Sequence, residues 1–140
     1  MAISQALCTS FKQEILQGIH LAADVYKIAL YTSSATLGAT TTTYSSTNEV
    51  SNGNGYTTGG ATLSGFTTNS SGTTAWIDWT VDPSWTTATI TARGALIYNS
   101  SRSNKAVAVI DFGADKTSTN GTFTATLPTA DASNAVIRLA

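Results

Sequence analysis

Few side chains in this sequence have the chemistry of a nucleophile or a general base, and they form no recognised constellation. The chain holds one histidine, His20, and one cysteine, Cys8. A serine or cysteine nucleophile needs an adjacent base, and His20 follows a predicted helix, far from any nucleophile-elbow pattern. We therefore interpret His20 as a surface or packing residue and Cys8 as a small, half-buried hydrophobic residue. With no second cysteine, no disulfide can form within the chain.

The carboxylates do not have the spacing of a metal or catalytic site either. Two pairs of aspartates stand four residues apart, Asp78 with Asp82 and Asp111 with Asp115. They lie in predicted strand and turn regions, and no Asp-x-Asp-x-Asp calcium loop is present. The letters "DFG" at 111–113 match a kinase motif, but the chain lacks a catalytic-loop signature and the length for two lobes. We expect no catalytic residue, no metal and no cofactor.

The segment "NGNGYTTGGATLSG" is rich in glycine, which a chain uses to approach a phosphate or to turn between strands. Its spacing is Gly53-x-Gly55-x-x-x-Gly59, one residue off the dinucleotide-binding fingerprint, and it has no P-loop lysine. Phosphate-binding loops also lead into a helix, whereas the residues that follow here are β-like. The segment is therefore predicted to be a long turn, in which these glycines and Gly60 supply positive φ angles or tight packing.

The composition argues against several classes of function. The chain has 140 residues, enough for one domain, with 41% apolar and 11% charged residues and a formal net charge of −1. Its seven basic residues are scattered, whereas nucleic-acid-binding domains carry clustered lysine and arginine. No stretch approaches the roughly 20 apolar residues of a membrane span, and "MAISQALC" lacks the regions of a secretory signal. We expect a protein made in the cytoplasm that binds neither nucleic acid nor membrane.

One helix is predicted near the N-terminus. Ser10 and Gln13 have the spacing of a capping box. Phe11, Ile15 and Ile19 then recur on one helical face. Gly18 is expected to end the helix.

Most of the remaining sequence has the two-residue period of β-strands. The run "AWIDWTV" is predicted to place Trp79 and Val81 inward and Trp76 and Asp78 outward. The other predicted strands cover residues 25–31, 87–92, 95–98, 105–112, 122–127 and 134–140. Polar clusters such as "NSSGTT", "NSSRSN" and "DKTSTNG" are predicted turns between them.

Short strands at regular spacing indicate an all-β fold, a jelly-roll-like antiparallel β-sandwich with one short N-terminal helix. Residues 1–23 are assigned to an N-terminal arm and the helix, and residues 24–140 to a single sandwich domain. Threonine fits this fold, because its β-branch favours strands while its hydroxyl tolerates water.

Four residues are candidates for contact with a partner. Trp76 is an aromatic side chain on an otherwise polar strand face; either it anchors an interface, as tryptophan often does, or it packs under a loop or the helix. Tyr56 is the one large aromatic side chain of the glycine segment and either anchors that loop or touches a neighbour. Ile3 and Leu7 have no evident place in the predicted core, so the N-terminal arm is predicted to dock on a partner.

Five segments together resemble a family of small virion proteins of tailed bacteriophages: "FKQEILQG", "YKIALYTSSATLG", "NEVSNGNGYTTGGATLSG", "RGALIYN" and "KAVAVIDFGADK". The nearest resemblance is to the head cement, or decoration, proteins of short-tailed phages, and it runs from Phe11 to the final strand. It implies a jelly-roll-like domain, often self-associated, that binds the major capsid protein on the outer surface of the capsid. We expect the self-association to be a homodimer, because exposed strand edges invite pairing and the chain has little charge to prevent it. The family offers no catalytic residues to carry over.

The alternative is a tail or fibre-associated β-module that binds a host receptor or a glycan. Such a module would use an aromatic platform with nearby acids, for which Trp76, Asp78 and Tyr56 are the candidates. An enzyme is the least favoured class. The sequence alone does not choose between a position on the head and one on the tail.

Overall fold

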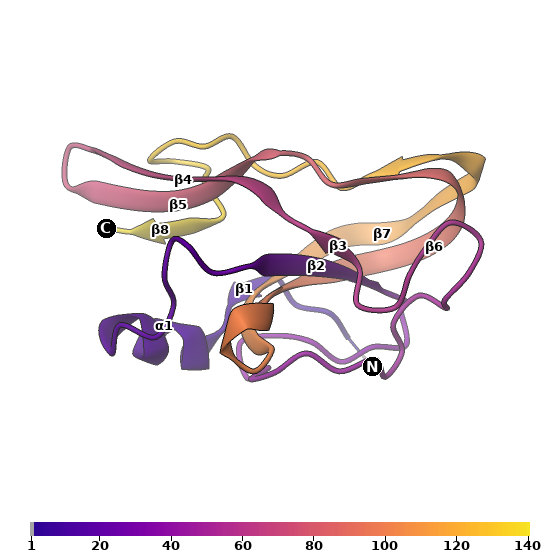
Figure 1. Ribbon diagram of the computed structural model, residues 1–140, viewed down its shortest axis with the longest axis horizontal. Helices are drawn as coiled ribbons and strands as arrows, with labels where there is room; N and C mark the ends of the chain where they lie inside the picture. The colour runs from indigo at the N-terminus through magenta and orange to yellow at the C-terminus, as the bar shows by residue number, and fades with distance from the viewer. Residues whose placement is uncertain (1) are drawn as a thin grey trace.

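The computed structural model describes residues 2–140, whose strands form two antiparallel sheets. One sheet has five strands in the order β1-β7-β6-β2-β3, and the other has three in the order β4-β5-β8. In chain order the elements are β1 (Ala6–Leu7), α1 (Thr9–Leu16), β2 (Tyr26–Tyr31), β3 (Ala61–Thr62), β4 (Ser64–Ser71), β5 (Thr74–Val81), β6 (Ser84–Asn99), the 3-10 helix η1 (Ser100–Arg102), β7 (Lys105–Thr124) and β8 (Ile137–Leu139). Figure 1 shows two layers, with α1 beneath the larger sheet on the side away from the smaller one. The predicted all-β sandwich with one short helix is confirmed.

The strands β6 and β7 form one long hairpin that dominates the larger sheet. Their register runs from Asn99 opposite Lys105 to Ser84 opposite Thr124, with bulges along the way. The four separate strands predicted over these residues are therefore parts of two strands. The predicted turn "DKTSTNG" is wrong, because these residues lie in β7 and pair with β6. Threonine and serine are compatible with a strand whose outer face meets water, so their abundance did not mark a turn here.

The smaller sheet contains a strand that the sequence pattern did not reveal. Strand β4 pairs along its length with β5, from Ser64 opposite Val81 to Ser71 opposite Thr74. The predicted turn "NSSGTT" is reduced to a tight connection at Gly72, whose φ is +58°. Because β4 is almost entirely polar, it shows no apolar alternation from which a strand could have been predicted.

Aromatic side chains fill the space between the two sheets. Tyr26 of β2 contacts Phe66 of β4 and Trp79 of β5, with ring centroids 5.7 and 5.3 Å apart. Towards the other end of the sandwich, Trp85 packs between Tyr56 and Phe123, at 5.8 and 6.1 Å. The Tyr26 contacts join the two sheets, and both groups of aromatic side chains belong to a single core.

The predicted alternation along β5 is correct for Trp79, which is buried, and wrong for two of its neighbours. Asp78 was expected to face outward but is 0% exposed, because the C-terminal segment covers that face and the Val136 amide donates to its Oδ2. Val81 was expected to face inward but is 53% exposed, because it lies at the margin of the small sheet, opposite Ser64.

The N-terminal residues belong to the core instead of forming a free arm. Ile3 is only 7% exposed and forms a bridge with Leu37, while β1 pairs with β7. The expectation that Ile3 and Leu7 have no place in the core is therefore wrong. The assigned boundary at residue 23 does not separate these residues from the sandwich.

The N-cap residue of the helix lies two residues before Ser10, the predicted N-cap. Cys8 is the N-cap residue, its amide is held by the Val107 carbonyl, and no side chain caps the helix. Ser10 lies inside α1, so the predicted capping box is wrong. Gly18, with a φ of +72°, follows the C-cap residue as expected for a helix end.

Candidate functional site

The glycine segment is held in place by the carboxylate of Glu49, which is 8% exposed. Its Oε1 accepts hydrogen bonds from the Tyr56 hydroxyl at 2.6 Å and the Gly59 amide at 2.7 Å. Its Oε2 accepts one from the Tyr44 hydroxyl at 2.6 Å. The Tyr98 hydroxyl of β6 donates to the Gly59 carbonyl at 2.7 Å. We call these five residues the Glu49 clamp; they fasten the loop to β6.

Burial and the nearby carboxylate both favour the neutral form of the clamp's phenols. The pKa of Tyr56 lies far above its usual value, first because of burial and then because its hydroxyl donates to Glu49. The pKa of Tyr98 is raised to about 12, again mainly by burial and then by Glu49. These tyrosines therefore remain protonated donors at any physiological pH.

Two glycines of this segment allow the backbone to pack directly on the larger sheet. A Cβ on Gly60 would collide with the Ile28 carbonyl of β2. A Cβ on Gly55 would lie 2.7 Å from the Cα of Ala88 in β6. Both glycines also have positive φ angles, +78° and +89°. The segment is thus a turn packed against two strands, as predicted, and its glycines serve close packing.

A second polar cluster joins α1 to the turn between β6 and β7. The His20 side chain is 1% exposed, and its Nε2 lies 3.1 Å from Glu14 Oε1. Lys105 Nζ lies 3.0 Å from the other oxygen of Glu14. Burial raises the pKa of Glu14, but the hydrogen bonds from Lys105 and His20 lower it more, so it stays below its usual value.

The orientation of Asn99 fixes the tautomer of His20. The Asn99 Oδ1 accepts from the Ser101 amide, so its Nδ2 faces His20 Nδ1 at 3.1 Å and donates to it. The proton of the neutral imidazole therefore sits on Nε2 and is donated to Glu14. Since both ring nitrogens are engaged in this way, His20 acts as a packing residue, the interpretation favoured by its sequence context.

Asp24 extends this cluster to the surface. Its carboxylate receives two hydrogen bonds from the Arg102 guanidinium, at 2.9 and 3.0 Å, and one from Asn99 Nδ2 at 2.8 Å. The Arg102 hydrogen bonds are the main reason that the pKa of Asp24 lies well below its usual range. Bidentate pairing of this kind fixes orientation as well as charge. The cluster locks the loop before β2 onto η1.

Asp78 is the remaining carboxylate with an unusual environment. Its oxygens accept from the Trp79 amide at 2.7 Å and the Val136 amide at 3.2 Å. Burial raises its pKa above the usual value. Its position beneath the C-terminal segment gives it a structural role, because it holds that segment on β5.

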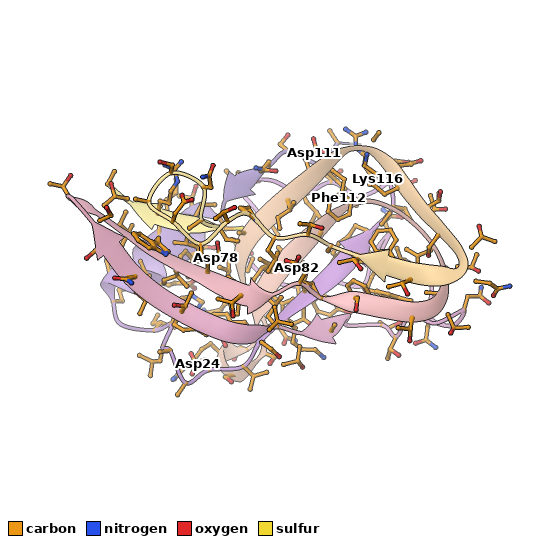
Figure 2. All side chains as sticks on the ribbon, turned by 90° about the horizontal axis from the view of Figure 1, so that it is seen from above. Asp24, Asp78, Asp82, Asp111, Phe112 and Lys116 are labelled. Carbon is orange, nitrogen blue, oxygen red and sulfur yellow. The ribbon has the colours of Figure 1, made fainter. Side chains whose placement is uncertain are left out.

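An open groove of about 1010 Å³ lies beside β7. One wall is formed by β1 and β7, and the other by residues 125–138 of the C-terminal segment. Figure 2 shows Asp111, Phe112 and Lys116 along the stretch of β7 that borders it. We call this hollow the β7 groove.

The four interface candidates from the sequence do not come together. Ile3 and Tyr56 are buried, so neither side chain is available to a partner in this structure. Leu7 is partly buried and lines the β7 groove. Trp76 is partly exposed on the smaller sheet, where the register places it between Asn69 of β4 and Arg138 of β8.

Metal-binding clusters and membrane-spanning helices are both absent from residues 2–140. Among residues 2–140, no three side chains of histidine, cysteine, aspartate or glutamate gather closely enough to form a metal site. No helix in that range has the length and apolar character needed to cross a membrane.

The β7 groove was missed by sequence reasoning because its walls come from both ends of the chain. Only the pairing of β1 with β7 and the return of residues 125–138 create it. Comparison of the chain with protein-family models, with curated proteins and with solved structures found no match.

Proposed function

We propose that this chain is a non-enzymatic structural protein of a phage virion, a decoration protein that binds the outer surface of the capsid. The observation that carries the proposal is that three carboxylates with well-defined partners are engaged within the fold. Glu14, Asp24 and Glu49 each bind partners within the chain and brace the fold. The β7 groove borders a strand edge and small polar side chains, a setting suited to binding another polypeptide.

The Glu49 clamp is built mostly from segments that carry the resemblance to phage cement proteins. Two of the segments that carry it, "NEVSNGNGYTTGGATLSG" and "RGALIYN", contribute Glu49, Tyr56, Gly59 and Tyr98 to this one cluster. Residues that are far apart in the sequence thus act together to fix one loop on one strand. The two segments therefore form one structural unit in this chain.

A rigid β-body suits the task of a cement protein. A protein that binds only assembled capsid subunits stabilises the shell by mass action. Many copies, each bound weakly, act together through multivalency. The low charge of the chain, 11% of residues, would make that attachment only weakly dependent on salt.

Self-association as a homodimer is part of the proposal. Strand β4 is the outer strand of the smaller sheet, and within residues 2–140 no strand pairs with its free edge. It carries no charged side chain that would discourage pairing with a second copy. Light scattering would show a dimer, and a monomer at every concentration would contradict this part.

The second candidate is a tail or fibre-associated module that binds a receptor or glycan. The partly exposed Trp76 favours it, because Asn69 and Arg138 flank that ring across the sheet. Tyr56 and Asp78 do not contribute to such a platform, since both are buried.

Electron microscopy of intact particles distinguishes the two candidates. A tagged copy of the chain should lie over the major capsid protein at regular positions on the head. A position on the tail or fibres would refute the decoration proposal and favour the receptor-binding module.

A further inference from the structure

The outer edge of β7 is only partly paired. Strand β1 covers it at two residues, where Ala6 is opposite Val109 and Leu7 opposite Ala108. The Gln5 side chain then accepts from the Asp111 amide. From 112 to 124, no second strand of the described chain pairs with this edge, although β6 pairs with the other. Unpaired strand edges are templates for another extended chain.

The β7 groove along this edge has room for a short strand. Neighbouring strands lie about 4.8 Å apart, a strand layer is about 10 Å thick, and each residue advances it by about 3.3 Å, or about 160 Å³ per residue. The groove volume of about 1010 Å³ therefore corresponds to about six residues of extended chain. Partly buried apolar side chains line it, among them Leu7, Phe112 and Val136.

Three charged residues line the groove, of which one is acidic and two are basic. Lys116 of β7 and Arg138 of β8 are exposed on its two sides, and neither has a carboxylate within 4.0 Å among residues 2–140. Asp111 is the one acidic residue of the lining, and the Arg93 guanidinium pairs with it at 3.1 Å. Asp131, which is outside the lining, acts electrostatically on Arg138, so Lys116 is the basic residue of the lining without a nearby carboxylate partner, and it favours an acidic segment as the occupant.

We propose that the β7 groove binds an extended segment of a partner protein that alternates acidic and apolar side chains and adds to β7 as a strand. Main-chain hydrogen bonds would supply affinity, the apolar side chains would face Leu7 and Phe112, and the acids would meet Lys116 and Arg138. This rests on the proposed function only in that a capsid subunit would supply the segment.

The test uses the isolated protein and a capped peptide of about eight residues that alternates valine with glutamate. Binding is followed by NMR amide shifts and by hydrogen exchange. We expect amides in residues 112–124 to shift and to gain protection. A peptide with lysine in place of glutamate, and one N-methylated at alternate residues, should not bind.

Charge-reversal variants locate the contacts. Lys116→Glu and Arg138→Glu should each weaken binding by about fivefold, because each removes one attraction and adds one repulsion. Lys12→Glu, which changes the same charge at an exposed position on α1, is the matched control and should bind like the original protein. Amide spectra of the free variants verify that they are folded.

Three results would overturn the inference. The first is that the lysine peptide binds as tightly as the glutamate peptide. The second is that Lys116→Glu binds the glutamate peptide as tightly as the original protein does. The third is that the peptide protects amides of β4 from hydrogen exchange, or protects none. Because no particles are used, failure here leaves the location of the protein on the virion to be decided separately by microscopy.

Discussion

Removal of the Glu49 carboxylate should loosen the glycine loop and destabilise the whole domain. In Glu49→Ala the buried Tyr56 hydroxyl and Gly59 amide both lose their acceptor, while the partly exposed Tyr44 can turn to water. An unsatisfied buried donor costs about 1–3 kcal/mol, and removal of the buried charge offsets part of this, so we expect a loss of about 2–4 kcal/mol.

Glu49→Gln separates hydrogen bonding from charge. Its amide oxygen can still accept from Tyr56 and Gly59, and its NH₂ group can donate to the Tyr44 oxygen. Only the charge assistance is lost, so we expect a loss of about 1–2 kcal/mol. Urea unfolding followed by tryptophan fluorescence measures both variants. If Glu49→Ala matches the original protein, or Glu49→Gln is as unstable as Glu49→Ala, the role assigned to the clamp is wrong.

Three further predictions follow from particular contacts. Gly60→Ala should destabilise the protein by about 3 kcal/mol or more through collision with β2 and a positive φ, against about 1 kcal/mol for Gly72→Ala in open space. Because the pKa of Asp24 is lowered in the folded state, its stabilising contribution is present at neutral pH and is lost as pH falls below about 4. Arg102→Gln should make the free energy of unfolding fall less steeply with pH in this range, and an unchanged slope would contradict the assignment. Burial raises the pKa of Cys8 to about 11, so iodoacetamide should label it at pH 8 only in urea, and rapid labelling of the folded protein would refute its burial.

The sequence was most informative where apolar side chains alternate. Residues 25–31 and 105–112 were predicted as strands, and all of them except Val25 lie in β2 and β7. Polar strands were missed, because β4 and the middle of β7 are built from serine, threonine and asparagine. In these strands the pairing partner, which the sequence does not display, decides the structure.

The candidate site was less predictable than the fold. Asp78 has the residue type of an outward-facing position, yet residues from the end of the chain cover it. Ile3 and Leu7 lacked a visible place because their partners, Leu37 and Ala108, are distant in sequence. Trp76 is partly exposed on β5, and its role as an interface residue stays a prediction. The burial of these residues depends on pairing between distant parts of the chain, which a local sequence pattern does not predict.

The temperature at which particles release their DNA tests the decoration proposal most directly. Particles assembled with and without the protein are heated, and free DNA is followed with an intercalating dye. We expect particles that lack the protein to release DNA at a lower temperature, and addition of the purified protein to restore the higher one. Equal release temperatures, with the protein present on the tail or absent from the head, would contradict the proposal.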